Sequence, residues 1–207
     1  MRVAVIGASG RTGRATVAHA LAAGHDVISF VRTPASAPQG TTVVQVDVRD
    51  EAGLAATLTG VDAVVSCVGH VTSDRDNTVL HDGAVALTAA MASAGASRLV
   101  AVSAAGAYVA SDDPLSRFIA KPILERMLKT NNEDTRAMEN VIRASDTSWT
   151  LLRPSRLVSG DGVRGYRRRL DQSVWWHYNT RFDTVGRAAV DAIAKPEWIG
   201  HAVFITD

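Results

Sequence analysis

The segment GASGRTG, residues 7–13, places glycines at positions 7, 10 and 13, directly after an apolar run from Val3 to Ile6. An Ala-rich helical pattern over Thr12 to Ala23 follows it. A glycine turn between a strand and a helix lets the backbone approach a phosphate closely, and the helix amides and dipole attract its charge. The segment therefore predicts a loop for the pyrophosphate of a dinucleotide, although a turn that only requires small residues has the same pattern.

The rest of the chain repeats this alternation of short β-branched runs and longer helical patterns. We expect strands at 3–6, 27–31, 43–46, 63–65, 99–102, 149–152 and 203–205, and helices at 12–23, 51–58, 79–94, 133–144 and 184–194. Apolar strands separated by helices are typical of a parallel sheet that is covered on both faces. The sequence therefore predicts an α/β fold, a doubly wound Rossmann fold with a mainly parallel sheet of six to seven strands.

Composition limits the partners that the chain can have. With 22 basic and 21 acidic residues the formal net charge is +1, so we expect no nucleic-acid partner. No stretch approaches eighteen apolar residues, which argues against a membrane span, and the single Cys67 suits a reducing, cytoplasmic location. We expect one domain over residues 1–207, monomeric or homodimeric, with substrate-side elements in the long connections 104–131 and 154–183.

The residue after the second expected strand bears on the choice of dinucleotide. An acidic side chain there accepts hydrogen bonds from the ribose hydroxyls of NAD, whereas this chain has Arg32. A guanidinium pairs well with the 2′-phosphate of NADP, and Arg11 in the glycine loop lies in a position to flank the same phosphate. The sequence favours NADPH over NADH, with a solvated charge at the strand end as the alternative for Arg32.

Several motifs along the chain carry a family resemblance. They are VAVIGASGRTG, VRTP, VQVDVRD, GVDAVVSCVG, RLVAVSAAGAY and MENVIRASDTSWTLLRPSRL. With them the chain resembles the atypical short-chain dehydrogenase/reductases that bind NAD(P)H, a group that contains NmrA-like proteins and the biliverdin-IXβ and flavin reductases. The resemblance implies a cofactor site made of Gly7, Ala8, Ser9, Gly10, Arg11, Thr12, Gly13, Arg32, Asp47, Val48, Ser66, Cys67, Val68, Gly69, Ser103 and Pro154.

Within that set the resemblance assigns positions along the dinucleotide. It implies that Asp47 and Val48 lie beside the adenine, residues 66–69 along the ribose, and Ser103 near the nicotinamide. Pro154, with Ser155, would close over the reactive end. All these positions end expected strands, where open α/β sheets bind ligands, although each could also be an ordinary strand terminus.

The chain departs from the larger dehydrogenase family in its proton-transfer residues. That family uses a Tyr-x-x-x-Lys pair, but the residues four positions after Tyr108, Tyr166 and Tyr178 are Asp, Leu and Phe. Arg136, near the expected lysine position, does not deprotonate usefully. We therefore expect an oxidoreductase that passes hydride from NADPH to a flavin, quinone or similar planar conjugated molecule, with Ser103 as hydrogen-bond donor to the substrate or carboxamide. The alternative is a non-catalytic NADP(H)-binding redox sensor of the NmrA-like type.

Three further features have both a functional and a structural interpretation. DDPLSRFIAKPILERML, residues 112–128, is a lid over an apolar substrate or a core helix, and GYRRRLDQSVWWHY, residues 165–178, is a substrate wall or a dimer contact. His70 follows the fourth strand, either near the nicotinamide or in a structural role. The spacing of His, Asp, Glu and Cys predicts no metal site.

Overall fold

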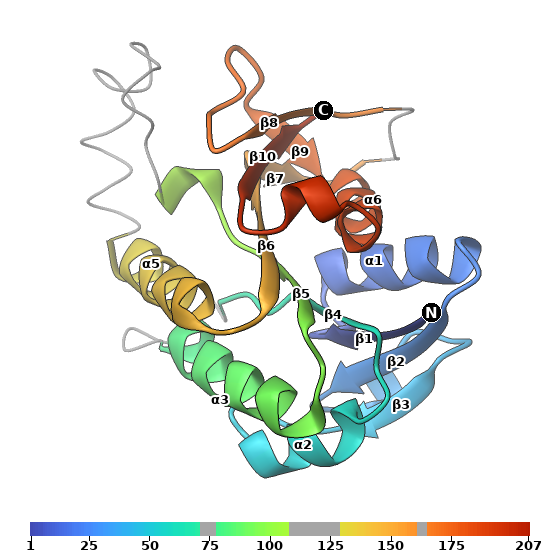
Figure 1. The fold of residues 1–207 in the computed structure, drawn as a ribbon. Coiled ribbons are helices and arrows are strands. Elements are labelled where there is room, and N and C mark those ends of the chain that lie inside the picture. The colour runs from blue at the N-terminus through green and yellow to red at the C-terminus, as the bar shows by residue number, and fades with distance from the viewer. Residues whose placement is uncertain (71–77, 108–128, 161–164) are drawn as a thin grey trace.

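The computed structural model describes residues 1–70, 78–107, 129–160 and 165–207 (Figure 1). Among them, eight strands form one sheet in the order β3-β2-β1-β4-β5-β6-β10-β8. Their bounds are β1 (Arg2–Ile6), β2 (Asp26–Val31), β3 (Thr42–Gln45), β4 (Ala63–Ser66), β5 (Arg98–Val102), β6 (Ser148–Pro154), β8 (Arg167–Leu170) and β10 (Ala202–Thr206). The neighbours from β3 to β10 are parallel, and β8 is antiparallel to β10. The doubly wound parallel sheet is confirmed, with β8 as an additional strand at one edge.

Helices cover both faces of the sheet, as right-handed crossovers require. One face packs against α1 (Arg11–Ala22) and α6 (Phe182–Ile193), and the other against α2 (Glu51–Leu58), α3 (Val79–Ala94) and α5 (Lys129–Ala144), as Figure 1 shows. Each face encloses its own apolar cluster, one around Val65 and Val185 and the other around Leu99 and Met91. Because the central strands are buried on both sides, β1 is apolar from Val3 to Ile6 and β4 is apolar from Ala63 to Val65.

The ends of these helices follow local chemistry. Asp50 starts α2, because its carboxylate accepts a hydrogen bond from the Gly53 amide. Gly95 ends α3 in the left-handed conformation, with φ of 72°. Helix α6 lies against α1 at Gly186, where an added Cβ would come within 2.5 Å of the Ala15 backbone. The glycine loop at the start of α1 is thus supported by close helix packing from behind.

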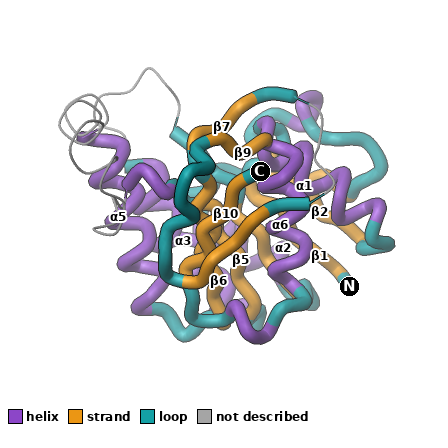
Figure 2. Tube along the Cα trace, turned by 90° about the horizontal axis from the view of Figure 1, so that it is seen from above, coloured by secondary structure: helices purple, strands orange, loops and turns teal. Residues whose placement is uncertain are grey.

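The connection 154–183 contains more regular structure than its sequence suggests. Besides β8 it forms β7 (Arg156–Val158) and β9 (Asn179–Arg181), which pair in parallel as a small second sheet. Figure 2 shows β7 and β9 beside each other at the end of β6. Residues 112–128, interpreted above as a lid or core helix, and Tyr108 lie outside the described residues. Among the described helices, none has both the length and the apolar character needed to cross a bilayer.

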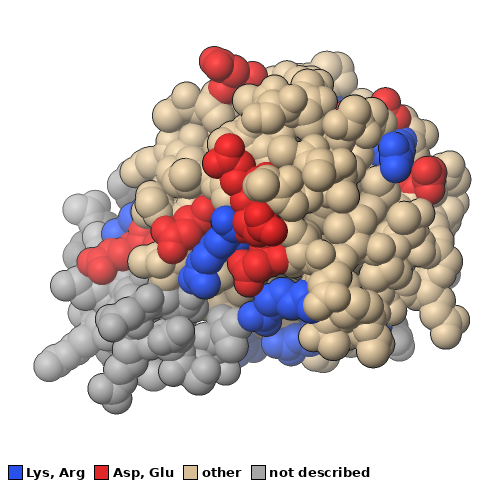
Figure 3. Space-filling view, turned by 90° about the horizontal axis from the view of Figure 1, so that it is seen from below, with Lys and Arg blue, Asp and Glu red and all other residues tan. Residues whose placement is uncertain are grey.

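The charged side chains are mixed rather than separated by sign on the face that Figure 3 shows. There, Lys and Arg lie among Asp and Glu over the molecular surface. Among the described residues, Arg49 and Asp82 form an ion pair at 3.6 Å. This face therefore presents no broad basic surface of the kind that polyanions bind.

Candidate functional site

The glycine loop is a tight turn held against β2. The amides of Gly7 and Ala8 both donate to the Phe30 carbonyl, at 3.2 and 3.3 Å. Gly7 has φ of +75°, a conformation that side chains disfavour. An added Cβ on Gly13 would stand 2.2 Å from the Gly7 oxygen, so this glycine allows α1 to approach β1. Two of the three glycines are thus required by the turn itself.

The same turn leaves amides of α1 available to an anion. The first helical bond runs from the Arg14 amide to the Gly10 carbonyl at 2.8 Å, so the amides of Arg11, Thr12 and Gly13 precede it. No described side chain caps this helix end. Gly10 is exposed, and an added Cβ there would meet only the Gly7 oxygen, at 3.4 Å. Uncapped amides beside an open glycine fit the pyrophosphate of a dinucleotide.

The loop opens onto the point where the order of the sheet reverses. Strand β1 has β2 on one side and β4 on the other. The crossover after β1 therefore leads to one side of the strand, and the crossover after β3 leads to the other side. The segment after β4 contacts the glycine loop directly, because an added Cβ on Gly7 would lie 3.0 Å from the Cys67 carbonyl. The Cys67 amide also donates to Ile6 at 2.9 Å. The backbone of Cys67 and Val68, within the segment predicted along the ribose, therefore lies beside the glycine loop at the reversal of the sheet.

Cys67 is not set up as a reactive thiol. Burial raises its pKa to about 11, although the hydrogen bond to Thr16 opposes this shift. The two side chains are 3.4 Å apart from sulfur to oxygen, which joins the segment after β4 to α1. A thiol with so high a pKa is a poor nucleophile at neutral pH. Its role is packing and a hydrogen bond behind the crevice.

Three arginines surround the crevice on the side of β2. Arg32 is exposed, and its guanidinium meets no partner within the described part of the chain. Arg14 donates to the carbonyls of Ser9 and Ser36, at 3.0 and 2.7 Å, so it ties the glycine loop to the segment after β2. The Arg11 guanidinium stacks on Phe182, with 4.2 Å to the ring centre. Arg14 was missed from sequence, because nothing in its helical pattern distinguishes it from a solvated charge.

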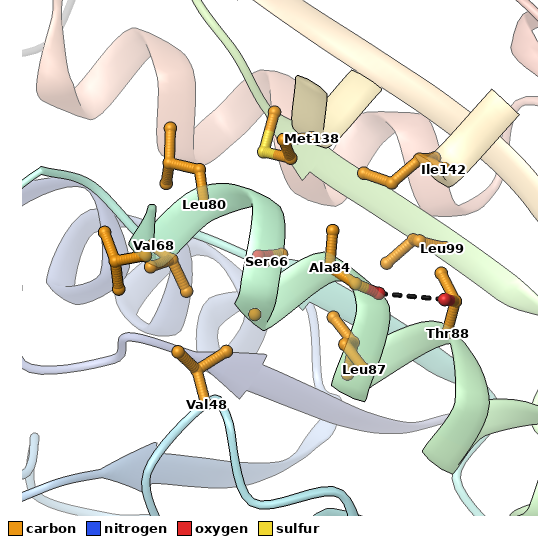
Figure 4. A pocket seen from close by; sticks show the side chains of 12 residues that line it. Val48, Ser66, Val68, Leu80, Ala84, Leu87, Thr88, Leu99, Met138 and Ile142 are labelled. Carbon is orange, nitrogen blue, oxygen red and sulfur yellow. Dashed lines mark hydrogen bonds between the residues drawn. The ribbon is translucent and has the colours of Figure 1, made fainter. Parts of the chain in front are cut away.

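Asp47 and Val48, predicted beside the adenine, lie in the turn after β3. The Asp47 carboxylate accepts from the Arg49 amide at 2.9 Å, so it shapes this turn. Val48 packs against Gly83 of α3, where an added Cβ would come within 3.0 Å of it. Together with Ser66 and Val68 it lines a narrow apolar hollow beneath the start of α3 (Figure 4). Val48 and the segment after β4 therefore share one wall.

Ser103 begins the segment after β5, and a buried ionic network engages its hydroxyl. It donates to Glu139 on α5 at 2.5 Å, and the Glu139 side chain is fully buried. Arg153 binds the same carboxylate through two nitrogens, at 3.0 and 2.5 Å. Since the Ser103 proton points to Glu139, the Ser103 oxygen is left to accept hydrogen bonds, which differs from the donor role expected from sequence.

The end of β6 and helix α5 hold the remaining predicted positions. Pro154 is buried at the end of β6, opposite Ile205 of β10. The Ser155 amide donates to the Thr180 hydroxyl at 3.1 Å, and its own hydroxyl donates to the His177 carbonyl at 3.3 Å. Ser155 thus joins the end of β6 to the small second sheet at the carboxyl edge. Arg136 donates to the Ala107 carbonyl at 2.8 Å and ties α5 to the segment after β5.

His70 forms a pair with a buried carboxylate on α5. Its Nε2 lies 3.0 Å from Asp134 Oδ2, and the Asp134 side chain is 4% exposed. Asp134 also accepts from the amides of Leu80 and His81, at 3.0 and 2.9 Å, and so binds the start of α3. Like Glu139 and Arg153, Asp134 was missed from sequence, because an acid in a polar helical stretch resembles a surface residue. The one signal in the sequence was its place two residues before Arg136, near the expected lysine position.

The arginine-rich and aromatic segment forms β8 and the turn that follows. Arg168 stacks on Trp198 and Arg169 on Trp175, with 5.3 and 5.7 Å to the ring centres. Trp176 is 73% exposed. The described residues contain no group of three or more potential metal ligands drawn from His, Cys, Asp and Glu. This segment lies at the outer edge of the sheet, beyond β10 and away from the glycine loop.

Comparisons with known proteins agree with this geometry. A family model described as NAD(P)H-binding matches residues 7–196. The chain therefore belongs to the NAD(P)H-binding family. It has the fold of NAD(P)-binding oxidoreductases.

Individual relatives differ in how much of each chain the similarity covers. The uncharacterized protein YwnB of Bacillus subtilis is 25% identical over 205 residues, 97% of this chain and 93% of YwnB. An uncharacterized protein of Mycobacterium tuberculosis is 36% identical over 101 residues, but the match spans only 12% of that protein and 48% of this chain. A wide-type short-chain dehydrogenase/reductase from Veillonella parvula, solved with NADP, has a TM-score of 0.82 at 16% identity, covering 100% of this chain and 94% of that one. This last similarity shows the fold.

Proposed function

We propose that this protein is an NADPH-dependent reductase that transfers hydride to a flavin, a quinone or a similar conjugated small molecule. The observation that carries the proposal is the uncapped start of α1, where three amides and the exposed Gly10 face the crevice at the sheet reversal. NADPH, when bound there, supplies the hydride. The chain's contribution is to orient the two planar partners and to exclude water.

The absence of a Tyr-x-x-x-Lys pair from the sequence narrows the substrate class. Alcohol and ketone exchange needs a hydroxyl that passes a proton, and Ser103 instead donates its proton to buried Glu139. A conjugated acceptor distributes the incoming charge over its ring system, so its reduction depends less on a protein group that transfers a proton. The Ser103 oxygen suits an amide donor, such as the carboxamide of a nicotinamide.

The preference for the phosphorylated dinucleotide rests on charge. An exposed Arg32 stands where an acid would bind a free ribose, and Arg14 anchors the neighbouring segment through Ser36. The protein from Veillonella parvula was solved with NADP. We propose that a small planar molecule is the second ligand, that the chain acts as a monomer or homodimer, and that it works in the cytoplasm without nucleic acid or membrane.

Mixing purified protein with NADPH and a panel of FMN, FAD and naphthoquinones tests the proposal. Loss of the reduced-nicotinamide absorbance above the rate without protein supports the reductase. Calorimetry on the same samples measures NADPH binding independently of turnover. Tight binding with no consumption across the panel would favour a redox sensor instead, and no heat of association would reject both.

A further inference from the structure

We propose that His70 is the proton donor to the reduced acceptor and that Asp134 positions its ring. This inference rests on the proposed reductase function. Two observations support it. His70 pairs with a buried carboxylate on α5, and it lies in the segment that follows β4; a histidine with only a packing role needs neither.

The location follows from the topology of the crevice. With the pyrophosphate at α1, the adenosine half extends toward β2, and the reactive half therefore extends toward β4 and β5. His70 is three residues beyond Cys67, whose carbonyl touches the glycine loop, so at most about 11 Å of chain separates them. Ser103, at the end of β5, lies on the same side of the crevice.

The hydrogen bonds of Asp134 define which nitrogen of the His70 imidazole carries a hydrogen. The carboxylate accepts from two backbone amides of α3, at 3.0 and 2.9 Å, in addition to His70. A carboxylate that accepts three hydrogen bonds is acceptor-only, so the Nε2 of His70 must carry its hydrogen toward Asp134. Nδ1 meets no hydrogen-bond partner within the described residues, which leaves it as the nitrogen that serves a ligand.

The proposed step balances in protons and electrons. The acceptor gains two electrons and one hydrogen as hydride from NADPH, which is oxidised. The Nδ1–H bond of the His70 imidazolium breaks, and an O–H or N–H bond forms at the acceptor heteroatom that holds the new charge. The imidazole is then neutral and regains a proton from water. A histidine whose ring is held in place by a carboxylate can act as a general acid.

The protein contains a matched control for this pair. His201 lies 2.5 Å from Asp171, Nδ1 to Oδ2, as a second histidine and carboxylate pair. It directly precedes β10, at the amino edge of the sheet and opposite the crevice. A His201→Gln substitution therefore makes the same chemical change away from the proposed site.

The experiment compares His70→Gln, His70→Ala and His201→Gln in steady-state assays with NADPH and FMN or 1,4-naphthoquinone. Glutamine keeps a hydrogen bond to Asp134 but transfers no proton. We expect kcat to fall about 100-fold or more in both His70 variants. We also expect an unchanged KM for NADPH, partial rescue of His70→Ala by added imidazole, and wild-type rates in His201→Gln.

Nitrogen NMR of histidine-labelled, ligand-free protein gives a readout that needs no turnover. The signals lost in His70→Gln should show Nε2 protonated and Nδ1 bare in the neutral ring; the opposite tautomer would overturn the proposal. A His70→Gln enzyme with wild-type kcat, or with only its KM changed, overturns the donor role and leaves the reductase standing. A wild-type protein that consumes no NADPH with any acceptor overturns both.

Discussion

The Ser103 hydroxyl donates to the Glu139 carboxylate over 2.5 Å, which links the end of β5 to α5. Arg153 neutralises that carboxylate from β6, so α5, β5 and β6 meet at one buried ion pair. The pair fixes the strand ends that form the floor of the crevice. It also sets the direction of the Ser103 hydroxyl.

Replacing Glu139 by alanine should destabilise the fold. The change removes the Glu139 carboxylate from the buried Arg153 guanidinium, and breaking a buried pair in this way costs about 3–5 kcal/mol. Urea unfolding of the variant measures the loss. Glu197→Ala, which removes an exposed carboxylate 3.7 Å from Lys195, should change stability by less than about 1 kcal/mol. Equal stabilities for the two variants would contradict a structural role for the buried pair.

Gly10→Ala and Gly13→Ala should separate cofactor binding from folding. The Gly13 methyl would stand 2.2 Å from a carbonyl oxygen, so this variant should lose about 1–3 kcal/mol or more of stability. The Gly10 methyl meets only one atom, at 3.4 Å, and should cost about 1 kcal/mol or less while it obstructs the phosphate path. Thermal unfolding and NADPH calorimetry check both changes. Wild-type NADPH affinity in Gly10→Ala would exclude the glycine loop as the phosphate site.

Replacing Arg32 by alanine should weaken NADPH binding and leave NADH binding unchanged. A lost hydrogen bond to a charged group is worth about 1.5–3 kcal/mol, which corresponds to roughly tenfold to a hundredfold in affinity. Arg2→Ala is the control for the loss of one positive charge. Arg2 begins β1, at the end of the strand away from the glycine loop, and lies 4.0 Å from Asp26. An equal loss of affinity for both dinucleotides would show that Arg32 does not read the 2′-phosphate.

The Cys67 thiol should react slowly with Ellman's reagent in the folded protein. Burial raises its pKa to about 11 from 9.0, so the thiolate fraction at pH 8 falls about 100-fold relative to an exposed thiol. Because the neutral form is the one that the fold favours, reactivity should increase as the pH rises toward 11. Urea-unfolded protein provides the fast reference rate. Rapid labelling of the folded chain at pH 8 would show that the thiol is accessible and ionised.

Much of the fold could be predicted from the sequence, because the apolar periods reflect burial directly. The predicted bounds of α3 match the structure, since an apolar stripe fills one helix face and Gly95 ends it. Strand β8 was missed because Arg-Arg-Arg-Leu has no apolar alternation and becomes a strand only by pairing with β10. Its conformation depends on a tertiary partner that a local pattern does not contain.

The parts of the candidate site that depend on local backbone geometry could be predicted from the sequence. The parts that depend on side chains far apart in the sequence could be predicted less well. The glycine spacing identified the turn at residues 7–13, because only glycine tolerates the contacts at Gly7 and Gly13. Asp134 and Glu139 resembled solvated helix charges, and only the packing of α5 shows that they are buried. One signal for Glu139 was available: Arg153 is a charged residue within the buried strand β6 and therefore needs an anion nearby.

The arginine-rich outer strand β8 has a consequence for self-association. Its backbone is the last of the sheet, and residues 167–170 are all exposed along it. A second copy that aligned the same strand would bring two triplets of guanidinium groups together, and like charges at such short range repel. This repulsion opposes the pairing of β8 strands from two molecules, which is the first step toward a fibril.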